Sequence, residues 1–209
     1  LQEQRMLISR DLHDNIGAQL TFIISAIENL KYFEPIKEQL TARYDTIAGF
    51  TKQTITELRD TIWAMNSGQV TLDSLMLRIQ DYVQKARESK SSMHFDCEVA
   101  ENLDSHSLLA SSDSIQVLRI VQEAVQNAVK YSEASQVQIR FHATKKDLVA
   151  TIHDNGRGFD QETILLGNGL YNMQKRAEEL GGKVEIKSGL GQGTTVKLTW
   201  PMAGSKEKN

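Results

Sequence analysis

The chain has 209 residues, of which 40% are hydrophobic, and a formal net charge of -3. This length allows one or two domains with a buried core, and the negative charge argues against nucleic acid as the main partner. Cys97 is the single cysteine, which excludes an internal disulfide and favours a reducing compartment. No segment resembles a transmembrane helix or a signal peptide. Because the chain starts with a leucine inside a helical pattern, we expect it to be a soluble, cytoplasmic piece of a longer protein.

Residues 1–66 have the pattern of two long amphipathic helices. Apolar residues recur at spacings of three and four from Leu12 to Leu30 and again from Ile36 to Met65, which places them on one face of each helix. Pro35 suits the first turn of the second helix. A hairpin alone would leave both apolar stripes half exposed, so we expect two copies to pair into a four-helix bundle, making a homodimer. The alternative is that both helices pack against the C-terminal domain of their own chain.

The pattern changes after residues 67–71, which we expect to be a linker, and residues 72–202 have the composition of an α/β domain. The predicted helices cover about residues 72–89, 113–131 and 169–180, the last one ending at Gly181 and Gly182. The predicted strands are 93–99, 137–141, 148–152, 183–188 and 194–199. We therefore predict an α + α/β chain, in which a helical hairpin precedes a two-layer α/β sandwich. Residues 203–209 are polar, and we expect a disordered tail there.

Glu123 and Asn127 lie four residues apart on one face of a predicted helix. Mg²⁺ bound with a triphosphate needs few protein oxygen ligands, because it keeps several of its waters. An amide oxygen beside a carboxylate suits that need, although the same pair alone is more typical of a solvated helix surface. Lys130 could meet phosphate charge, but alone it is more typical of a solvated lysine.

Glycine-bearing segments follow this helix in a fixed order. Asp154 ends a predicted strand, where its carboxylate can accept a hydrogen bond from an exocyclic amine such as that of adenine. Gly156 and Gly158 free the backbone there to approach a flat base. Gly167 and Gly169 precede a predicted helix, whose first N–H groups can hold phosphate oxygens.

A last turn, containing Gly191, Gly193 and Thr194, supplies further flexible backbone and hydrogen-bond donors. Each glycine segment alone is as well explained by an ordinary turn or hairpin. The ordered set behind a Mg²⁺-type ligand is harder to produce by chance, and it predicts a pocket for ATP and Mg²⁺.

His13 lies at the edge of the apolar stripe of the first predicted helix, next to Asp14. A histidine there is exposed enough to attack a phosphoryl group, and a neighbouring carboxylate can take its Nδ1 proton. The ATP pocket downstream favours this role for His13. We interpret the other histidines as surface residues, and none of them has metal-ligand spacing with Cys97; they are His94, His106, His142 and His153.

Taken together, these residues resemble a sensor histidine kinase of the DesK/NarX-like subfamily. The likeness spans nearly the whole chain, from residues 10–14, which contain His13, through Leu58–Trp63 to Thr195–Leu198. It includes the phosphoacceptor box at His13, the asparagine box at Glu123 and Asn127, and all the glycine boxes.

The resemblance implies a dimeric phosphoacceptor domain and a Bergerat-type (GHKL) ATP-binding domain. It implies autophosphorylation of His13 from Mg-ATP, transfer to an aspartate of a response regulator, and membrane anchoring only through an upstream region. By the same matching, Asp14 is the base that activates His13, Glu123 is catalytic, Asn127 is the Mg²⁺ ligand and Asp154 is the adenine contact. Arg157 and Phe159 fall inside a glycine box without an assigned role.

The chain departs from the subfamily at Ala18. In much of the subfamily a glutamine stands there and helps to place the water that dephosphorylates the regulator. Gln19 is rotated by about 100° on the helix, so we predict weak or absent phosphatase activity. The remaining alternatives are another GHKL-type ATPase or protein kinase, and a non-catalytic dimer that binds nucleotide as a signal.

Overall fold

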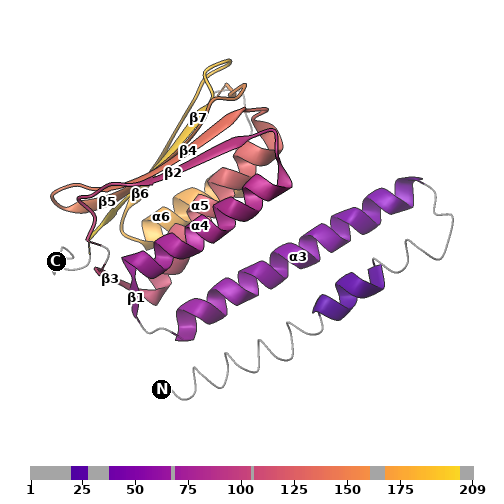
Figure 1. The fold of residues 1–209 in the computed structure, drawn as a ribbon, viewed down its shortest axis with the longest axis horizontal. Helices are drawn as coiled ribbons and strands as arrows, with labels where there is room; N and C mark the ends of the chain where they lie inside the picture. Colours follow the sequence, from indigo (N-terminus) through magenta and orange to yellow (C-terminus); the bar gives the residue numbers. More distant parts are fainter. Residues whose placement is uncertain (1–19, 28–37, 67–68, 105, 161–167, 203–209) are drawn as a thin grey trace. The chain divides into compact units, whose positions relative to one another are not determined.

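The computed structural model describes residues 20–27, 38–66, 69–104, 106–160 and 168–202. The chain divides into two compact units, residues 1–68 and residues 69–209. Figure 1 shows the elements of both units with their labels.

The N-terminal unit is helical in all the residues described. Residues 20–27 form a helical segment, and α3 covers Glu38–Asn66. Ile55, Ile62 and Ala64 of α3 are buried, whereas Phe50 is 72% exposed. The expected first helix is seen only in residues 20–27, and His13, Asp14, Ala18 and the expected turn lie outside the described residues.

The second unit is built on a five-stranded sheet with the strand order β2-β4-β5-β7-β6. Strand β2 is parallel to β4, and all the other neighbours are antiparallel. The strands cover His94–Val99 (β2), Gln136–Ala143 (β4), Asp147–Asp154 (β5), Lys183–Ser188 (β6) and Thr194–Pro201 (β7). The predicted strands of this sheet are all present, and Asp154 ends β5 as expected.

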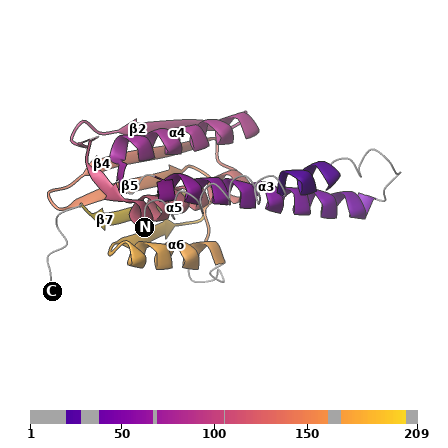
Figure 2. The ribbon, with the colours of Figure 1, turned by 90° about the horizontal axis from the view of Figure 1, so that it is seen from below.

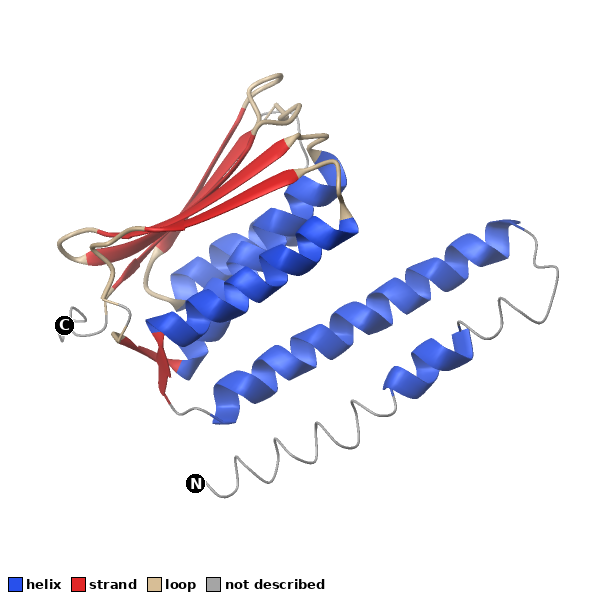
Figure 3. Cartoon of the chain, viewed as in Figure 1, coloured by secondary structure: helices blue, strands red, loops and turns tan. Residues whose placement is uncertain are grey.

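Three helices cover one face of this sheet, as Figures 1 and 3 show. They are α4 (Leu72–Ser89), α5 (Ser111–Tyr131) and α6 (Asn168–Glu179). Helix α5 packs against α4 on one side and α6 on the other, as the view in Figure 2 also shows. The two-layer prediction for this domain is therefore confirmed.

The core lies between the helices and the sheet, where the apolar periodicity of each element meets. Fully buried side chains come from both layers, namely Leu75, Ile79, Leu118, Ile120, Phe95, Ile139, Met173 and Leu198. The opposite face of the sheet carries polar pairs, such as Arg140 Nε at 3.0 Å from Glu98 Oε2. This one-sided burial explains the alternating pattern of the strands.

Residues 69–71, which we expected in the linker, form strand β1 (Gln69–Thr71). It pairs antiparallel with β3 (Leu108–Ala110), and Val70 lies opposite Leu109 with both side chains buried. Thr71 then caps α4, accepting a hydrogen bond from the backbone N–H of Ser74 at 3.2 Å. A strand of three residues is too short to show an alternating pattern, which is why sequence analysis missed both strands.

The second unit also contains a glycine helix stop and a buried tryptophan. Helix α6 ends at Glu179, and Gly181 just beyond it has a φ of 69°, as the expected glycine stop requires. Trp200 on β7 is 2% exposed, and its indole N–H has no hydrogen-bond partner among the described residues. No helix within the described ranges is long and apolar enough to span a membrane.

Candidate nucleotide-binding site

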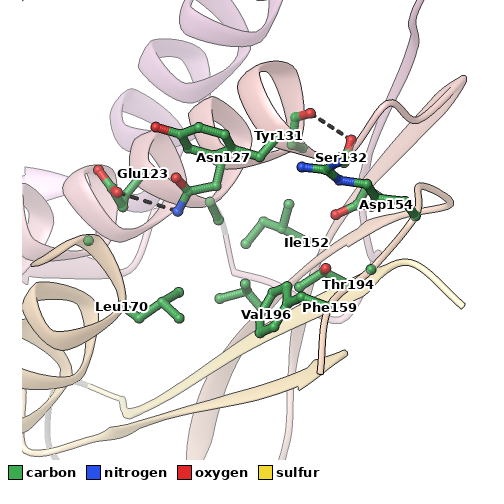
Figure 4. A pocket seen from close by; sticks show the side chains of 15 residues that line it. Glu123, Asn127, Tyr131, Ser132, Ile152, Asp154, Phe159, Leu170, Thr194 and Val196 are labelled. Carbon is green, nitrogen blue, oxygen red and sulfur yellow. Dashed lines mark hydrogen bonds between the residues drawn. The ribbon is translucent and has the colours of Figure 1, made fainter. Parts of the chain in front are cut away.

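A pocket of about 460 Å³ opens between helix α5, the start of α6, and the neighbouring ends of β5 and β7. Figure 4 shows the side chains that line it. Its polar lining residues are Glu123, Asn127, Tyr131, Ser132, Asp154, Arg157 and Thr194, and its glycines are Gly158 and Gly169. The remainder of the wall is apolar and is formed by Ala124, Ala128, Ile152, Phe159, Leu170 and Val196.

One end of the pocket, which we call the helix end, is formed by Glu123 and Asn127 of α5. The amide Nδ2 of Asn127 donates to Glu123 Oε1 at 3.3 Å. This bond uses the amide nitrogen, so the amide oxygen remains available as a ligand. Gly169 of α6 lies against the same carboxylate, and a Cβ at Gly169 would overlap Glu123 Oε1.

The other end, which we call the loop end, contains Asp154 at the end of β5. Its side chain is only 6% exposed, and its Oδ1 accepts a hydrogen bond from the backbone N–H of Gly156 at 3.0 Å. Burial raises the pKa of Asp154 above its ordinary value, while the backbone N–H groups of Gly156 and Thr194 and the nearby His153 oppose this rise. Asp154 is therefore a buried hydrogen-bond acceptor, and burial destabilises its charged form relative to its protonated form.

The glycines of the loop end allow backbone segments to touch. Gly158 has a φ of 60° and Gly193 a φ of 73°, values that disfavour any side chain. A Cβ at Gly158 would overlap the carbonyl oxygen of Gly189, and one at Gly193 would overlap that of Asp154. The loop after β5 and the turn before β7 are thus held together by main-chain contacts.

Gly156 has a different role from the approach to a base that we expected. It is buried, and a Cβ there would overlap the carbonyl oxygen of Ser132 at the end of α5. The same oxygen accepts a hydrogen bond from the backbone N–H of Arg157 at 2.7 Å. Gly156 therefore lets the loop dock on the end of α5.

Ser188, at the end of β6, joins three segments of the loop end. Its Oγ accepts a hydrogen bond from the backbone N–H of Phe159 at 2.9 Å and donates to the carbonyl oxygen of Gly193 at 3.0 Å. It also lies 2.9 Å from Thr194 Oγ1. Sequence analysis did not single out Ser188, since a serine before a glycine turn has no distinctive pattern.

The structure brings most of the expected site residues into one place. Glu123, Asn127, Asp154, Gly158, Gly169 and Thr194 line the pocket. Gly156, Gly191, Gly193 and Lys130 are absent from its lining, and Lys130 is exposed on α5. Gly167, His13 and Asp14 lie outside the described residues.

Several pocket residues were missed or left without a role by sequence analysis. Tyr131, Ile152, Leu170 and Val196 look like ordinary helix or strand residues in the sequence, and only the fold places them at the pocket. Arg157 and Phe159 could have been anticipated from their position beside Gly158. The guanidinium Nη1 of Arg157 also lies 3.3 Å from Glu133 Oε1.

The donor set at the helix end fits Mg²⁺ better than a tightly held transition metal. Across the described parts of the chain, no three His, Cys, Asp or Glu side chains gather in a way that could hold a metal ion. Mg²⁺ usually takes only one or two protein oxygens together with phosphate and water. The amide oxygen of Asn127, beside Glu123, meets that requirement.

Two protein families match different parts of the chain. Residues 4–70 match the family described as "Histidine kinase". Residues 112–204 match the family described as "Histidine kinase-, DNA gyrase B-, and HSP90-like ATPase". The second match contains every residue that lines the pocket.

Solved structures of histidine kinases share the fold. The histidine kinase domain from the Erythrobacter litoralis EL346 blue-light activated histidine kinase is 16% identical, with a TM-score of 0.57, over 88% of this chain and 96% of that chain. The Acinetobacter baumannii histidine kinase AdeS is 14% identical, with a TM-score of 0.56, over the same shares. Full-length ShkA in complex with AMPPNP is 17% identical, with a TM-score of 0.58, over 96% of this chain and 46% of that chain.

Sequence identities this low show that the fold is shared and nothing more. The two family matches also indicate the function of each domain. The histidine kinase match precedes the ATPase match along one chain, in the order that the sequence motifs predict. The two domain matches and the shared fold together support a sensor histidine kinase.

Proposed function

We propose that the chain is the catalytic core of a two-component system, which phosphorylates its own His13 from Mg-ATP and passes the phosphoryl group to an aspartate of a response regulator. The observation that carries this proposal is the pocket between α5 and β5, with a carboxylate and amide pair at one end and a buried carboxylate at the other. Its position within the ATPase match supports a nucleotide as the ligand.

At the loop end, Asp154 is the residue that would receive the base. Its buried carboxylate accepts hydrogen bonds, and the exocyclic amine of adenine donates them. Ile152 and Val196 lie between the two ends of the pocket in Figure 4 and offer apolar surface to the faces of the base. An apolar wall with one buried polar group is typical of a site that orients its ligand.

At the helix end, Asn127 would hold Mg²⁺ through its amide oxygen. The ion, when bound, neutralises charge on the transferred phosphoryl group. The Asn127–Glu123 hydrogen bond fixes the side chain of Asn127, and the first turn of α6 offers backbone N–H groups to phosphate oxygens. Glu123 would act on the reacting groups at this end.

The N-terminal unit would supply the phosphoacceptor. His13 attacks the terminal phosphorus, its new N–P bond replaces the P–O bond to ADP, and Asp14 holds the Nδ1 proton. Phe22 and Phe50 of this unit are 75% and 72% exposed, and exposed aromatic side chains on helices favour a partner surface. They support a homodimer, in which this unit would form the four-helix bundle.

The proposal extends to subfamily and regulation. The motifs around His13 and Asn127 favour the DesK/NarX-like subfamily, anchored to the membrane through an upstream region. Ala18 predicts weak or absent phosphatase activity toward the phosphorylated regulator, with a gain on Ala18→Gln. Decay of purified phospho-regulator in the presence of the His13→Ala chain measures this activity without back-transfer to histidine.

The phosphoacceptor is tested by labelling the chain with γ-labelled ATP. We expect an acid-labile, base-stable label that disappears in His13→Gln, while ATP binding is retained because the pocket lies in the other unit. His106→Gln, which changes an exposed histidine of the second unit, serves as the matched control and should label normally. Equal labelling of His13→Gln and the unchanged chain would remove His13 from the mechanism.

A further inference from the structure

The neighbours of the Ser188 hydroxyl determine in which of its hydrogen bonds it donates and in which it accepts. The serine hydroxyl has one proton to donate and two lone pairs that accept. The carbonyl oxygen of Gly193 can only accept, so the single proton of Ser188 is used there, at 3.0 Å. The backbone N–H of Phe159 can only donate, so it occupies one lone pair, at 2.9 Å.

The third contact is then determined by elimination. Thr194 Oγ1 lies 2.9 Å from Ser188 Oγ, and either hydroxyl could be the donor if the pair stood alone. Because the proton of Ser188 is already committed to Gly193, Thr194 must donate to Ser188. The only proton of the Thr194 hydroxyl is thereby used in the bond to Ser188. Toward any other group, the Thr194 hydroxyl can only accept hydrogen bonds.

Thr194 is placed to use its lone pairs in the pocket. It lies directly opposite Asp154 in the pairing of β5 with β7, and both residues line the pocket. Figure 4 shows the two side chains at the same end. The Asp154 carboxylate also accepts, so this end presents acceptors from both strands.

We propose that Ser188 is a positioning residue that turns the Thr194 hydroxyl into an acceptor and so selects a purine with an amino group over one with a carbonyl at the same ring position. The proposal rests on the proposed ATP site and adds the means by which the base is distinguished. An exocyclic amine can donate to Asp154 and Thr194, whereas a carbonyl oxygen at the same position faces the lone pairs of both residues. Leaving buried acceptors facing another acceptor is the arrangement that rejects a wrong ligand most strongly.

The test compares the affinities of the full chain for ATP and for inosine triphosphate, which replaces the amine of adenine with a carbonyl. We expect the unchanged chain to prefer ATP. Ser188→Ala frees the Thr194 proton. The dissociation constant for inosine triphosphate divided by that for ATP should therefore fall by about tenfold, the effect of one net hydrogen bond. Ser188→Thr keeps a hydroxyl at the same place and should restore the ratio.

A second variant separates selection from folding. Thr194→Val keeps the bonds of Ser188 to Phe159 and Gly193 but removes the hydroxyl in question, and it should lower the ratio as much as Ser188→Ala does. The double variant should lower it no further, because both changes break one relay. If Ser188→Ala does not fold, as judged by its thermal melt, an unchanged ratio in Thr194→Val still overturns the inference.

Two outcomes would overturn the inference while leaving the ATP site intact. One is an equal loss of affinity for both nucleotides in Ser188→Ala and Thr194→Val, which would assign Ser188 a purely structural role. The other is an unchanged ratio in both variants. If the unchanged chain did not bind ATP, the proposed function itself would fail, and this inference would fail with it.

Discussion

The two ends of the pocket use glycine in different ways. At the helix end, Gly169 makes room for the side chain of Glu123, whose carboxylate can move. At the loop end, Gly158 and Gly193 make room for main-chain oxygens, which cannot move without displacing the loop. Glycine therefore keeps the Glu123 carboxylate in place at the helix end and permits main-chain packing at the loop end. Substitutions should separate an effect on the reaction from an effect on stability.

The largest effect is expected at the loop end, for Gly158→Ala. The left-handed φ of 60° costs alanine about 1–2 kcal/mol, and overlap with the carbonyl oxygen of Gly189 adds about 1–3 kcal/mol. We expect a large loss of unfolding free energy together with loss of ATP binding, measured by urea unfolding and nucleotide titration.

Gly191→Ala is the matched control for this change. Gly191 has a φ of 72°, but a Cβ there meets nothing within 4 Å. Its cost should therefore be only the conformational part, about 1–2 kcal/mol. Equal destabilisation of the two variants would show that the main-chain packing between the two turns contributes nothing.

At the helix end, Gly169→Ala should impair the reaction more than the fold. The new methyl group displaces the Glu123 carboxylate and breaks its bond with Asn127. Glu123 is the catalytic carboxylate of the proposed function, and displacing such a group costs about 10²–10⁴-fold in rate, so we expect autophosphorylation to slow strongly while the thermal melt changes little.

Gly156→Ala supplies the contrast, because its Cβ would overlap the fixed carbonyl oxygen of Ser132. It should lower the melting temperature clearly. If Gly169→Ala destabilised the domain as much as Gly156→Ala, the distinction between the two ends would be wrong.

A smaller effect is expected from pH, through Asp154. Its pKa is raised by burial, so the folded domain binds a proton at Asp154 more readily than the unfolded chain does. Its contribution to stability is fully present below the ordinary pKa and is lost as the pH rises through the raised value. ATP affinity should change in the opposite direction, falling as the pH drops through that value, because a protonated carboxyl is a poorer partner for an amine.

Asp154→Asn should remove both pH dependences. At neutral pH the variant should bind ATP more weakly without being less stable, since an amide oxygen can still accept from Gly156 and the charge no longer has to be desolvated. Titrations of affinity and unfolding against pH check this. A steep pH dependence that persists in Asp154→Asn would assign it to another group.

The smallest effect is expected just outside the pocket, at Glu133. This residue has a φ of 55°, a left-handed conformation after the end of α5. Glu133→Gly relieves the strain and loses only the exposed ion pair with Arg157, which contributes little. We expect stabilisation by a few tenths to about 1 kcal/mol, measured by urea unfolding, whereas destabilisation would show that the ion pair outweighs the strain.

Sequence reasoning reached the features that depend on neighbours along the chain. The periodicity of α5 predicted the helix that carries Glu123 and Asn127, and the alternation of β5 predicted that Asp154 ends a strand. It also anticipated that Gly158 belongs to the site. In each case, the residues that determine the structure lie within a few positions of one another.

The features that escaped prediction depend on contacts across the fold. A glycine at 156 signals that space is needed, but not that the carbonyl of Ser132 fills that space. Ser188 accepts a hydrogen bond from Phe159, which lies 29 residues earlier in the chain, in the loop after β5. Likewise, Val70 of β1 lies opposite Leu109 of β3. Both strands are too short to produce an alternating pattern in the sequence.

The burial of Trp200 has a spectroscopic consequence. The chain has two tryptophans, Trp63 in α3 of the first unit and Trp200 in β7 of the second. An indole that is 2% exposed should emit at short wavelength and shift to the red when water reaches it. A Trp63→Phe chain would therefore have one tryptophan, and its emission, excited at the red edge where tyrosine does not absorb, would report the unfolding of the second unit separately from that of the helical unit.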